Sequence, residues 1–391
     1  MSKAFINGAV LRWARERADM PPEQLAKKIG QKADRLARWE AGEDQPTFKQ
    51  AVRLASVTHV PFGYFFLPQP PVEDLPLPDL RTVGGEPARA FDSNTTDLIR
   101  DVLFKHAWFV EHLKQQGHEP LSFVARYRLT DSPVDIAANI RSTLNLTDAT
   151  ARSANWEEFI RLLIDSAEAA GVWIMRTGIV GSDTHRSLSV RQFRGFAISD
   201  PVAPLVFING KDALAAQIFT FAHELAHIWL GSSGVSNVQI GRRDYGTSRR
   251  TEIVCNAVAA ELLVPRDDFE KSWSNTKSQN ANYDDLARRF KVSRIVIARR
   301  ALDLGKIPEG AYSAFYKEEE DRWEEERREQ ADKASGGNFY STLPLRNGSR
   351  FTNAVVSSAM SGDTLLRDAA SLLNIQPATV VKFYKKATAP K

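Results

Sequence analysis

Residues 219–230 read Phe-Thr-Phe-Ala-His-Glu-Leu-Ala-His-Ile-Trp-Leu and set His223, Glu224 and His227 into an otherwise apolar run. In a helix, residues four positions apart lie on one side, so the two imidazoles can each direct a nitrogen toward a single metal ion. Glu224 is offset from that ligand direction but can reach a water on the ion, which suits a general base. The stretch therefore predicts a helix with a metal site capable of hydrolysis.

The alternative interpretation is a core helix whose two histidines are merely hydrogen-bonded. Such a helix would bury two imidazoles and a carboxylate, although its other positions already supply an apolar face. Burying polar groups without need costs free energy. This cost favours metal ligation over the structural interpretation.

A hydrolytic zinc site needs a third protein ligand, and two acids downstream compete for that place. Glu252 lies 25 residues after His227 and Glu261 lies 34 after it, both in an apolar helix that we expect to end at Pro265. Glu252 shares a helix face with Asn256, whose amide can orient a ligating imidazole. We therefore assign Glu252 as the ligand and expect Glu261 to be solvated near the helix end.

With these residues in place, the chain resembles the ImmA/IrrE metallopeptidases. The segments that carry the resemblance are 196–209, 221–227 and 252–265, within about residues 150–310. The resemblance implies a gluzincin-like zinc endopeptidase in which His223, His227 and Glu252 hold Zn²⁺, Glu224 activates water and Asn256 stands four after the ligand Glu. It also implies a protein substrate, typically a transcriptional regulator cleaved under stress. An antitoxin-like partner is a related expectation, and the sequence does not name the substrate.

Composition limits the remaining choices. A chain of 391 residues fits two or three domains. We find no apolar run near twenty residues and no export signal, so we expect a cytoplasmic protein with no membrane partner. The single cysteine, Cys255, is expected to be a small core residue. A net charge of +4 is too small to indicate nucleic-acid binding on its own.

Residues 4–67 predict a bundle of five short helices with a helix-turn-helix order. Trp39-Glu40-Ala41-Gly42, followed by Gln45-Pro46-Thr47, resembles the Xre-type repressor domain. The resemblance implies that DNA is a partner of this module.

The expected recognition helix presents Lys32, Arg35 and Arg38 to DNA phosphates. Two residues depart from the Xre pattern. Pro22 replaces a glutamine that holds a phosphate in that family, and Asp34 repels phosphate. The alternative is a helical module that docks on a protein.

The middle of the chain predicts a proline-rich linker and then an α+β region. Helical periodicity is found in residues 97–116, 133–144 and 156–170, and Gly171 ends the last of these. Short β-rich runs follow at 172–175, 188–190, 195–198 and 205–208, and the edge of their sheet could bind an extended peptide. His185 and Asn209, at strand ends, either line the cleft or cap turns. Residues 231–250, with Tyr245, are interpreted as a lid loop.

Two more segments have helix-turn-helix texture. Residues 283–303 are interpreted as structural, as in the family, and residues 345–385 form a third such unit after a charge-dense helix at 317–333. The last unit carries basic residues that fit a nucleic-acid or acidic-partner surface: Arg346, Arg350, Lys382, Lys385 and Lys386.

We therefore predict an α+β, mainly α, protein with four parts. These are a helix-turn-helix domain (1–67), a proline-rich linker (68–90), a zinc metallopeptidase domain (91–310) with a small sheet, and a charged helix with a helix-turn-helix-like region (311–391). The predicted function is zinc-dependent cleavage of a regulatory protein in stress response or in toxin or mobile-element control. The alternative is a non-proteolytic DNA-binding regulator with a structural or sensory zinc site. Sequence does not separate zinc from manganese.

Overall fold

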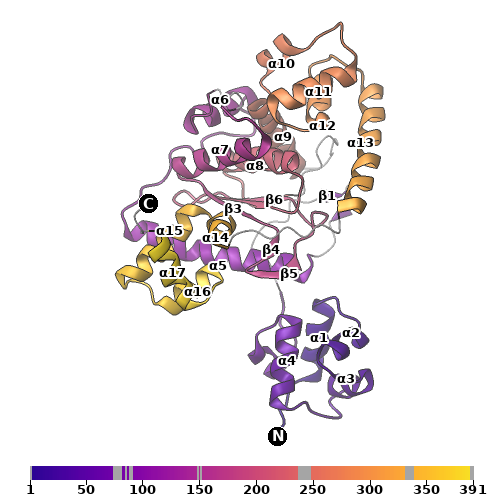
Figure 1. Cartoon of the computed structure of the whole chain (residues 1–391), viewed down its shortest axis with the longest axis vertical. Helices are drawn as coiled ribbons and strands as arrows, with labels where there is room; N and C mark the ends of the chain where they lie inside the picture. The colour runs from indigo at the N-terminus through magenta and orange to yellow at the C-terminus, as the bar shows by residue number, and fades with distance from the viewer. Residues whose placement is uncertain are drawn as a thin grey trace. The chain divides into compact units, whose positions relative to one another are not determined.

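The structure is a computed structural model of the chain and describes residues 2–73, 82–83, 86–87, 91–147, 149, 152–236, 248–330 and 339–387. The fold is α+β and mainly helical, as predicted (Figure 1). Its contacts divide the chain into two compact units, Met1–Pro76 with Arg89–Arg100, and Leu77–Ala88 with Asp101–Lys391. Within the described residues, every helix is too short or too polar to cross a membrane.

Unit 1 is the predicted five-helix bundle. It contains α1 (Gly8–Arg17), α2 (Pro22–Lys28), α3 (Ala33–Glu40), α4 (Phe48–Thr58) and the 3-10 helix η1 (Phe62–Phe66). Thr47 begins α4 with a reciprocal capping box to Gln50. Gly8 lets α1 approach α3 closely, because a Cβ there would lie 2.4 Å from the Glu40 carbonyl oxygen. The core contains Leu11, Leu25, Leu36, Trp39, Leu54 and Phe65, all fully buried.

Unit 2 is built on a four-stranded mixed sheet. Its strands are β3 (Trp173–Thr177), β6 (Gly195–Ile198), β7 (Leu205–Asn209) and β8 (Gly234–Ser236), in the order β3-β7-β6-β8. β3 and β7 are parallel, whereas β6 is antiparallel to both β7 and β8. β8 therefore occupies one edge of the sheet and β3 the other.

The predicted strand at 188–190 is wrong. The structure instead has a hairpin of β4 (Ile179–Val180) and β5 (Asp183–Ser187), and Leu188 follows it as a buried residue outside any strand. β5 reads Asp-Thr-His-Arg-Ser and is mostly exposed, so it lacks the apolar alternation that reveals a strand. The turn is possible because Gly181 adopts φ +55°.

Helices lie on both faces of the four-stranded sheet. Figure 1 shows α7 (Trp156–Ala170) and α8 (Leu214–Leu230) on one side and α5 (Ser93–Gln115) on the other, and α6 (Pro133–Thr143) packs further out. Alternation along the strands divides the core accordingly. Ile174 faces the cluster formed with α8, whereas its neighbour Trp173 contacts Phe109 of α5.

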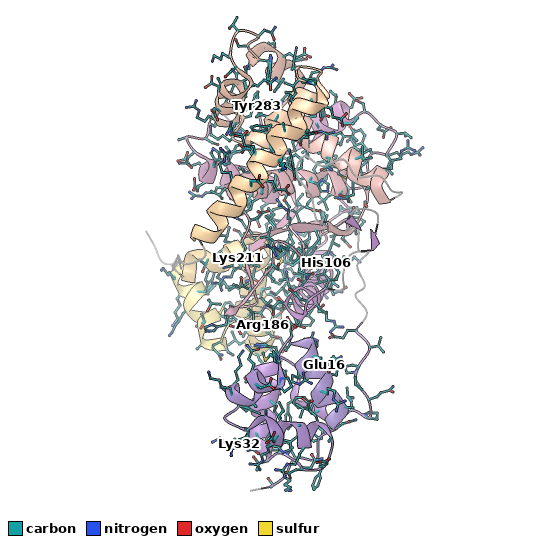
Figure 2. All side chains as sticks on the ribbon, turned by 90° about the vertical axis from the view of Figure 1, so that its right-hand side faces the viewer. Glu16, Lys32, His106, Arg186, Lys211 and Tyr283 are labelled. Carbon is teal, nitrogen blue, oxygen red and sulfur yellow. The ribbon has the colours of Figure 1, made fainter. Side chains whose placement is uncertain are left out.

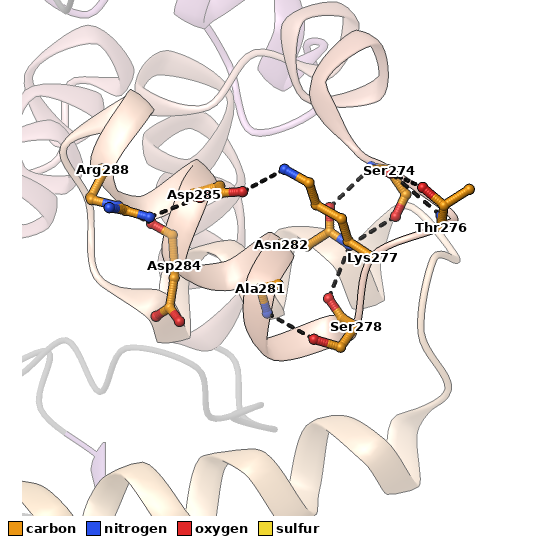
Figure 3. A network of polar contacts seen from close by, with 9 residues as sticks. All are labelled: Ser274, Thr276, Lys277, Ser278, Ala281, Asn282, Asp284, Asp285 and Arg288. Carbon is orange, nitrogen blue, oxygen red and sulfur yellow. Dashed lines mark hydrogen bonds and ion pairs between the residues drawn. The ribbon is translucent and has the colours of Figure 1, made fainter.

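The chain after β8 is entirely helical in the described residues. α9 (Ser248–Leu263), α10 (Arg266–Ser272), α11 (Gln279–Phe290), α12 (Arg294–Asp303) and α13 (Glu309–Gln330) follow in order. A polar network sets the start of α11 (Figure 3). Ser278 caps the helix by accepting from the Ala281 N–H, and the Asn282 amide donates to the carbonyl oxygens of Ser274 and Ser278.

The last four helices are α14 (Phe339–Asn347), α15 (Ser349–Ser361), α16 (Leu366–Leu373) and α17 (Pro377–Ala387). They attach to the β3 edge through Trp173. Its indole N–H donates to the Asn347 carbonyl oxygen at 2.6 Å, and its ring stacks on Phe351 at 4.6 Å. Gly348, at φ +79°, leaves no room for a Cβ beside the same indole. The β3 edge of the sheet is therefore occupied.

Candidate metal centre

His223, Glu224 and His227 all lie on α8, a helix that is buried along almost its whole length. His223 and Glu224 are fully buried and His227 is 1% exposed. The helix ends just after the motif, where Gly231 adopts φ 71° and the Ser232 N–H donates to the His227 carbonyl oxygen. The site therefore sits near the C-terminal end of a core helix.

α9 packs against α8 and brings Glu252 to the two histidines. The three residues place one nitrogen or oxygen each within a small triangle. The Nε2 atoms of His223 and His227 are 3.0 Å apart. Glu252 Oε2 lies 3.1 Å from His223 Nε2, and Oε1 lies 3.2 Å from His227 Nε2.

This triangle fits a small divalent cation. Ligand bonds of about 2.0–2.1 Å in tetrahedral geometry place ligand atoms about 3.3 Å apart. The two imidazole nitrogens are 3.0 Å apart, and each lies 3.1–3.2 Å from a different oxygen of Glu252, so the cluster is close to that size. A cation at the centre of the triangle would satisfy the lone pairs that the His223 and His227 Nε2 atoms direct toward one another and toward Glu252. Two histidines and one carboxylate also leave a fourth position for water or substrate.

Asn256, one turn after Glu252, holds the His223 ring. Its Oδ1 accepts from His223 Nδ1 at 3.1 Å. Since Nδ1 carries the proton, the lone pair of Nε2 is directed toward the centre of the triangle. The structure thus brings the predicted amide to the place where it can orient a ligating imidazole.

The charges around the triangle fix its protonation. Burial raises the pKa of the Glu252 carboxyl, but the nearby imidazoles of His223 and His227 outweigh that effect and hold the pKa far below its usual range. Glu252 is therefore a carboxylate. Burial raises the pKa of the Cys255 thiol well above its usual value, with Glu252 and Glu224 adding to the effect. Cys255 stays a neutral core residue, as predicted.

Gly195 of β6 is a site residue that sequence reasoning missed. A Cβ there would lie 2.5 Å from Thr220 Cγ2 of α8 and 3.1 Å from Glu224 Oε1. The bare backbone thus lets α8 lie close to the sheet and leaves room beside the Glu224 carboxylate. The available signal was a glycine at the start of β6, the second strand ahead of the motif helix.

Glu261 is not solvated, contrary to the prediction. It forms an ion pair with Arg300 of α12, and their side chains are only 11% and 9% exposed. The residue lies on the same helix as Glu252 but its carboxylate is turned to α12. Glu261 therefore joins two helices and is not part of the cluster of His223, His227 and Glu252.

Other predicted site residues lie elsewhere. Asn209 is buried and caps a turn, since it donates to the Phe193 carbonyl oxygen and accepts from the Lys211 N–H. His185 is exposed on β5. Tyr245 and most of the predicted lid lie outside the described residues, and so does much of the predicted linker at 68–90.

The predicted DNA contacts lie around α3 of unit 1. Lys32, at the N-cap of α3, and Arg38 are exposed, and Lys32 is labelled in Figure 2. Arg35 is less available, because it packs 5.4 Å from the Trp39 ring centre and donates to Gln31 Oε1. Pro22 takes the first position of α2 with no side-chain cap. Of the three predicted cationic contacts, Lys32 and Arg38 are exposed to solvent and Arg35 is partly buried.

Comparison with known families agrees with this geometry. Residues 167–302, which include β3, α8, α9 and α12, match the family described as IrrE N-terminal-like domain, a peptidase family. Residues 11–65 match a helix-turn-helix family, and residues 347–386 match a domain of unknown function. No curated protein matches the chain. Residues 167–302 are thus similar to the IrrE N-terminal-like peptidase domain, and residues 11–65 ahead of them are similar to a helix-turn-helix domain.

Proposed function

We propose that this chain is a zinc-dependent endopeptidase that hydrolyses a peptide bond of a regulatory protein. The observation that carries the proposal is the triangle of His223, His227 and Glu252 next in sequence to the buried Glu224. The two imidazole nitrogens are 3.0 Å apart, and each lies 3.1–3.2 Å from an oxygen of Glu252. Two imidazoles with one carboxylate are the donor set of several hydrolytic zinc sites. Glu224 supports the enzyme over a structural zinc site, because a structural site needs no base.

The residues divide the chemistry among them. Zinc bound at such a site lowers the pKa of water to about 7 and polarises a carbonyl group. Glu224 accepts the proton of the attacking water on its carboxylate and passes it to the nitrogen of the leaving amine. Asn256 holds the His223 ring in its ligating orientation. The buried surroundings of α8 keep bulk water from the reacting groups.

The sheet supplies a place for the substrate backbone. β3 is covered by α14 and α15, whereas β8 is paired with β6 alone among the described residues. An extended peptide can therefore add beside β8 as a further strand. β6, the neighbour of β8, also carries Gly195 next to Glu224.

The N-terminal module is assigned DNA as its partner in this proposal. Lys32 and Arg38 contact phosphates, with Arg35 contributing once it leaves the Trp39 ring. The fusion fits a protein that acts on transcription, with a repressor or an antitoxin-like protein as substrate.

The proposal is tested with Glu224→Gln. We expect this variant to keep about one zinc per chain and to lose about 10²–10⁴-fold in cleavage rate, because its amide cannot take the proton of the attacking water. It should also trap the substrate. A pull-down with Glu224→Gln, compared with wild type, therefore identifies the candidate, and the zinc-loaded wild type should cut that candidate at one site.

Metal analysis provides the control. His223→Ala and Glu252→Ala should lose zinc, and loading with zinc against manganese identifies the ion that supports cleavage. Zinc retained in Glu252→Ala contradicts the ligand assignment. If wild type and Glu224→Gln capture the same partner equally and neither cleaves it with either metal, the chain is a metal-bearing regulator and the peptidase proposal fails.

A further inference from the structure

The C-terminal helices α16 and α17 repeat the internal geometry of the helix-turn-helix in unit 1. In unit 1, α2 and α3 are joined through Gly30 at φ +68°. In the C-terminal unit, α16 and α17 are joined through Asn374 at φ 54°. Asparagine is the residue after glycine that best tolerates this left-handed conformation.

The buried positions fall at the same spacing from that left-handed residue. A small residue lies four before it, an apolar residue six after it and an aromatic residue nine after it, and all are buried. The two sets are Ala26, Leu36 and Trp39 around Gly30, and Ala370, Val380 and Phe383 around Asn374. Since these positions fix how the second helix crosses the first, α17 corresponds to the recognition helix of the motif.

The outward face of α17 is basic. Lys382 and Lys385 are exposed, Ala378 is exposed one turn before Lys382, and α17 contains no acidic residue. Gln376 and Thr379, at the start of the helix, line a groove of about 570 Å³ whose opposite wall is the β4–β5 hairpin. This end of the helix presents polar side chains beside open space. By contrast, Arg350 bonds to the Gly171 carbonyl oxygen inside the unit and belongs to no such surface.

Side-chain contacts hold the turn between the two helices. Asn374 donates to Asp101 of α5 at 3.0 and 3.1 Å, and its carbonyl oxygen accepts from Ser182 of the hairpin at 2.6 Å. Asp101 in turn pairs with Lys105, which is 2% exposed and also donates to Asn347. The turn is thus anchored to α5 and to the β4–β5 hairpin elsewhere in unit 2, and Lys382 and Lys385 of α17 are exposed.

We propose that this C-terminal unit is a second DNA-binding surface, in which α17 enters the major groove of duplex DNA. Lys382 and Lys385 contact phosphates, and Gln376 and Thr379 lie at the end of the helix that approaches the base edges. DNA is favoured over an acidic peptide because the spacing reproduces a whole helix-turn-helix and the width of one helix fits the major groove. This assignment does not depend on the proposed peptidase activity.

The test is DNA binding by the full-length chain across a salt series. The starting protein carries Lys32→Ala and Arg38→Ala, so that unit 1 contributes little. Fluorescence anisotropy with a labelled duplex of about 30 base pairs measures the affinity from about 50 to about 200 mM salt. We expect Lys382→Glu with Lys385→Glu to weaken binding at least tenfold at the lowest salt and to reduce the slope of log affinity against log salt by about 1.8.

The matched control is Lys271→Glu, which reverses an exposed charge on α10 of the same unit. It should leave the slope within error of the starting protein. Equal affinities for the Lys382, Lys385 variant and for Lys271→Glu overturn the proposal, and so does an absence of DNA binding at the lowest salt. Competition with polyglutamate separates the sources of attraction. If polyglutamate displaces DNA at equal charge concentration, the face recognises acidic polymers in general and the DNA assignment fails.

Discussion

Helices α12 and α17 stand at the same place in the same motif, yet one is interior and the other displays a basic surface. Each follows a left-handed residue at φ 54°, Lys291 before α12 and Asn374 before α17. Ala287 and Ile297 are buried at the spacing of Ala370 and Val380. Local geometry therefore makes a helix-turn-helix in both cases, and the surroundings of the second helix decide its use.

The residues that occupy equivalent positions explain the difference. Ile295 of α12 is fully buried, whereas Ala378 at the same position of α17 is exposed. Arg299 of α12 pairs with Asp303 at 3.0 Å, whereas Lys382 and Lys386 stand at those positions in α17. α12 also carries Arg300, which pairs with Glu261 of α9, the helix that carries Glu252. The prediction that residues 283–303 are structural agrees with this burial.

The largest expected effect is at Arg300. Its pairing with Glu261 is nearly buried, so Arg300→Ala leaves a carboxylate without its partner and should cost about 3–5 kcal/mol of unfolding free energy. Lys385→Ala on α17 should stay within about 0.5 kcal/mol. Urea unfolding of the zinc-loaded chain measures both. If Arg300→Ala lowers the unfolding free energy less than Lys385→Ala does, α12 does not contribute to stability through Arg300. The proposed difference between α12 and α17 is then wrong.

A smaller effect, of opposite sign in the two motifs, is expected at the left-handed residues. Asn374→Gly removes the hydrogen bonds to Asp101 and should destabilise by about 1–3 kcal/mol. Lys291→Gly removes a strained non-glycine residue and should stabilise by about 0.5 kcal/mol, since the relief of strain exceeds the entropy that glycine adds. Thermal unfolding measures the change in melting temperature of each variant. If both variants shift the melting temperature in the same direction, this account of how the two turns are held is wrong.

The smallest effect concerns charge pairing along the helix. Lys386→Asp gives α17 the arrangement found at Arg299 and Asp303, and should change stability by only about 0.3–0.5 kcal/mol. Because it also replaces a positive charge with a negative one that repels phosphate, we expect this variant to weaken duplex binding. Lys386→Gln removes the positive charge without adding a carboxylate that could pair with Lys382. If the two variants bind DNA with equal affinity, pairing with Lys382 is unimportant for DNA binding.

The sequence by itself determined the elements whose causes are local. α7 spans Trp156–Ala170 as predicted, because Asn155 caps its first turn and Gly171 ends it at φ 109°. The helical period alone places His223 and His227 on one side of a helix. The order of small, left-handed and apolar positions around Gly30 and Asn374 is likewise a local pattern. Such features are set within about ten residues.

Only the tertiary structure decided the features that join distant segments. The contact of Glu261 with Arg300 spans 39 residues, and the approach of Gly195 to Glu224 spans a strand and half a helix. β5 pairs with the buried strand β4 but is itself mostly exposed, so no apolar period marks β5. The difference between α12 and α17 has the same origin. Sequence periodicity predicts that a helix has an apolar face, but the opposite face is buried or exposed according to which other segments pack against it.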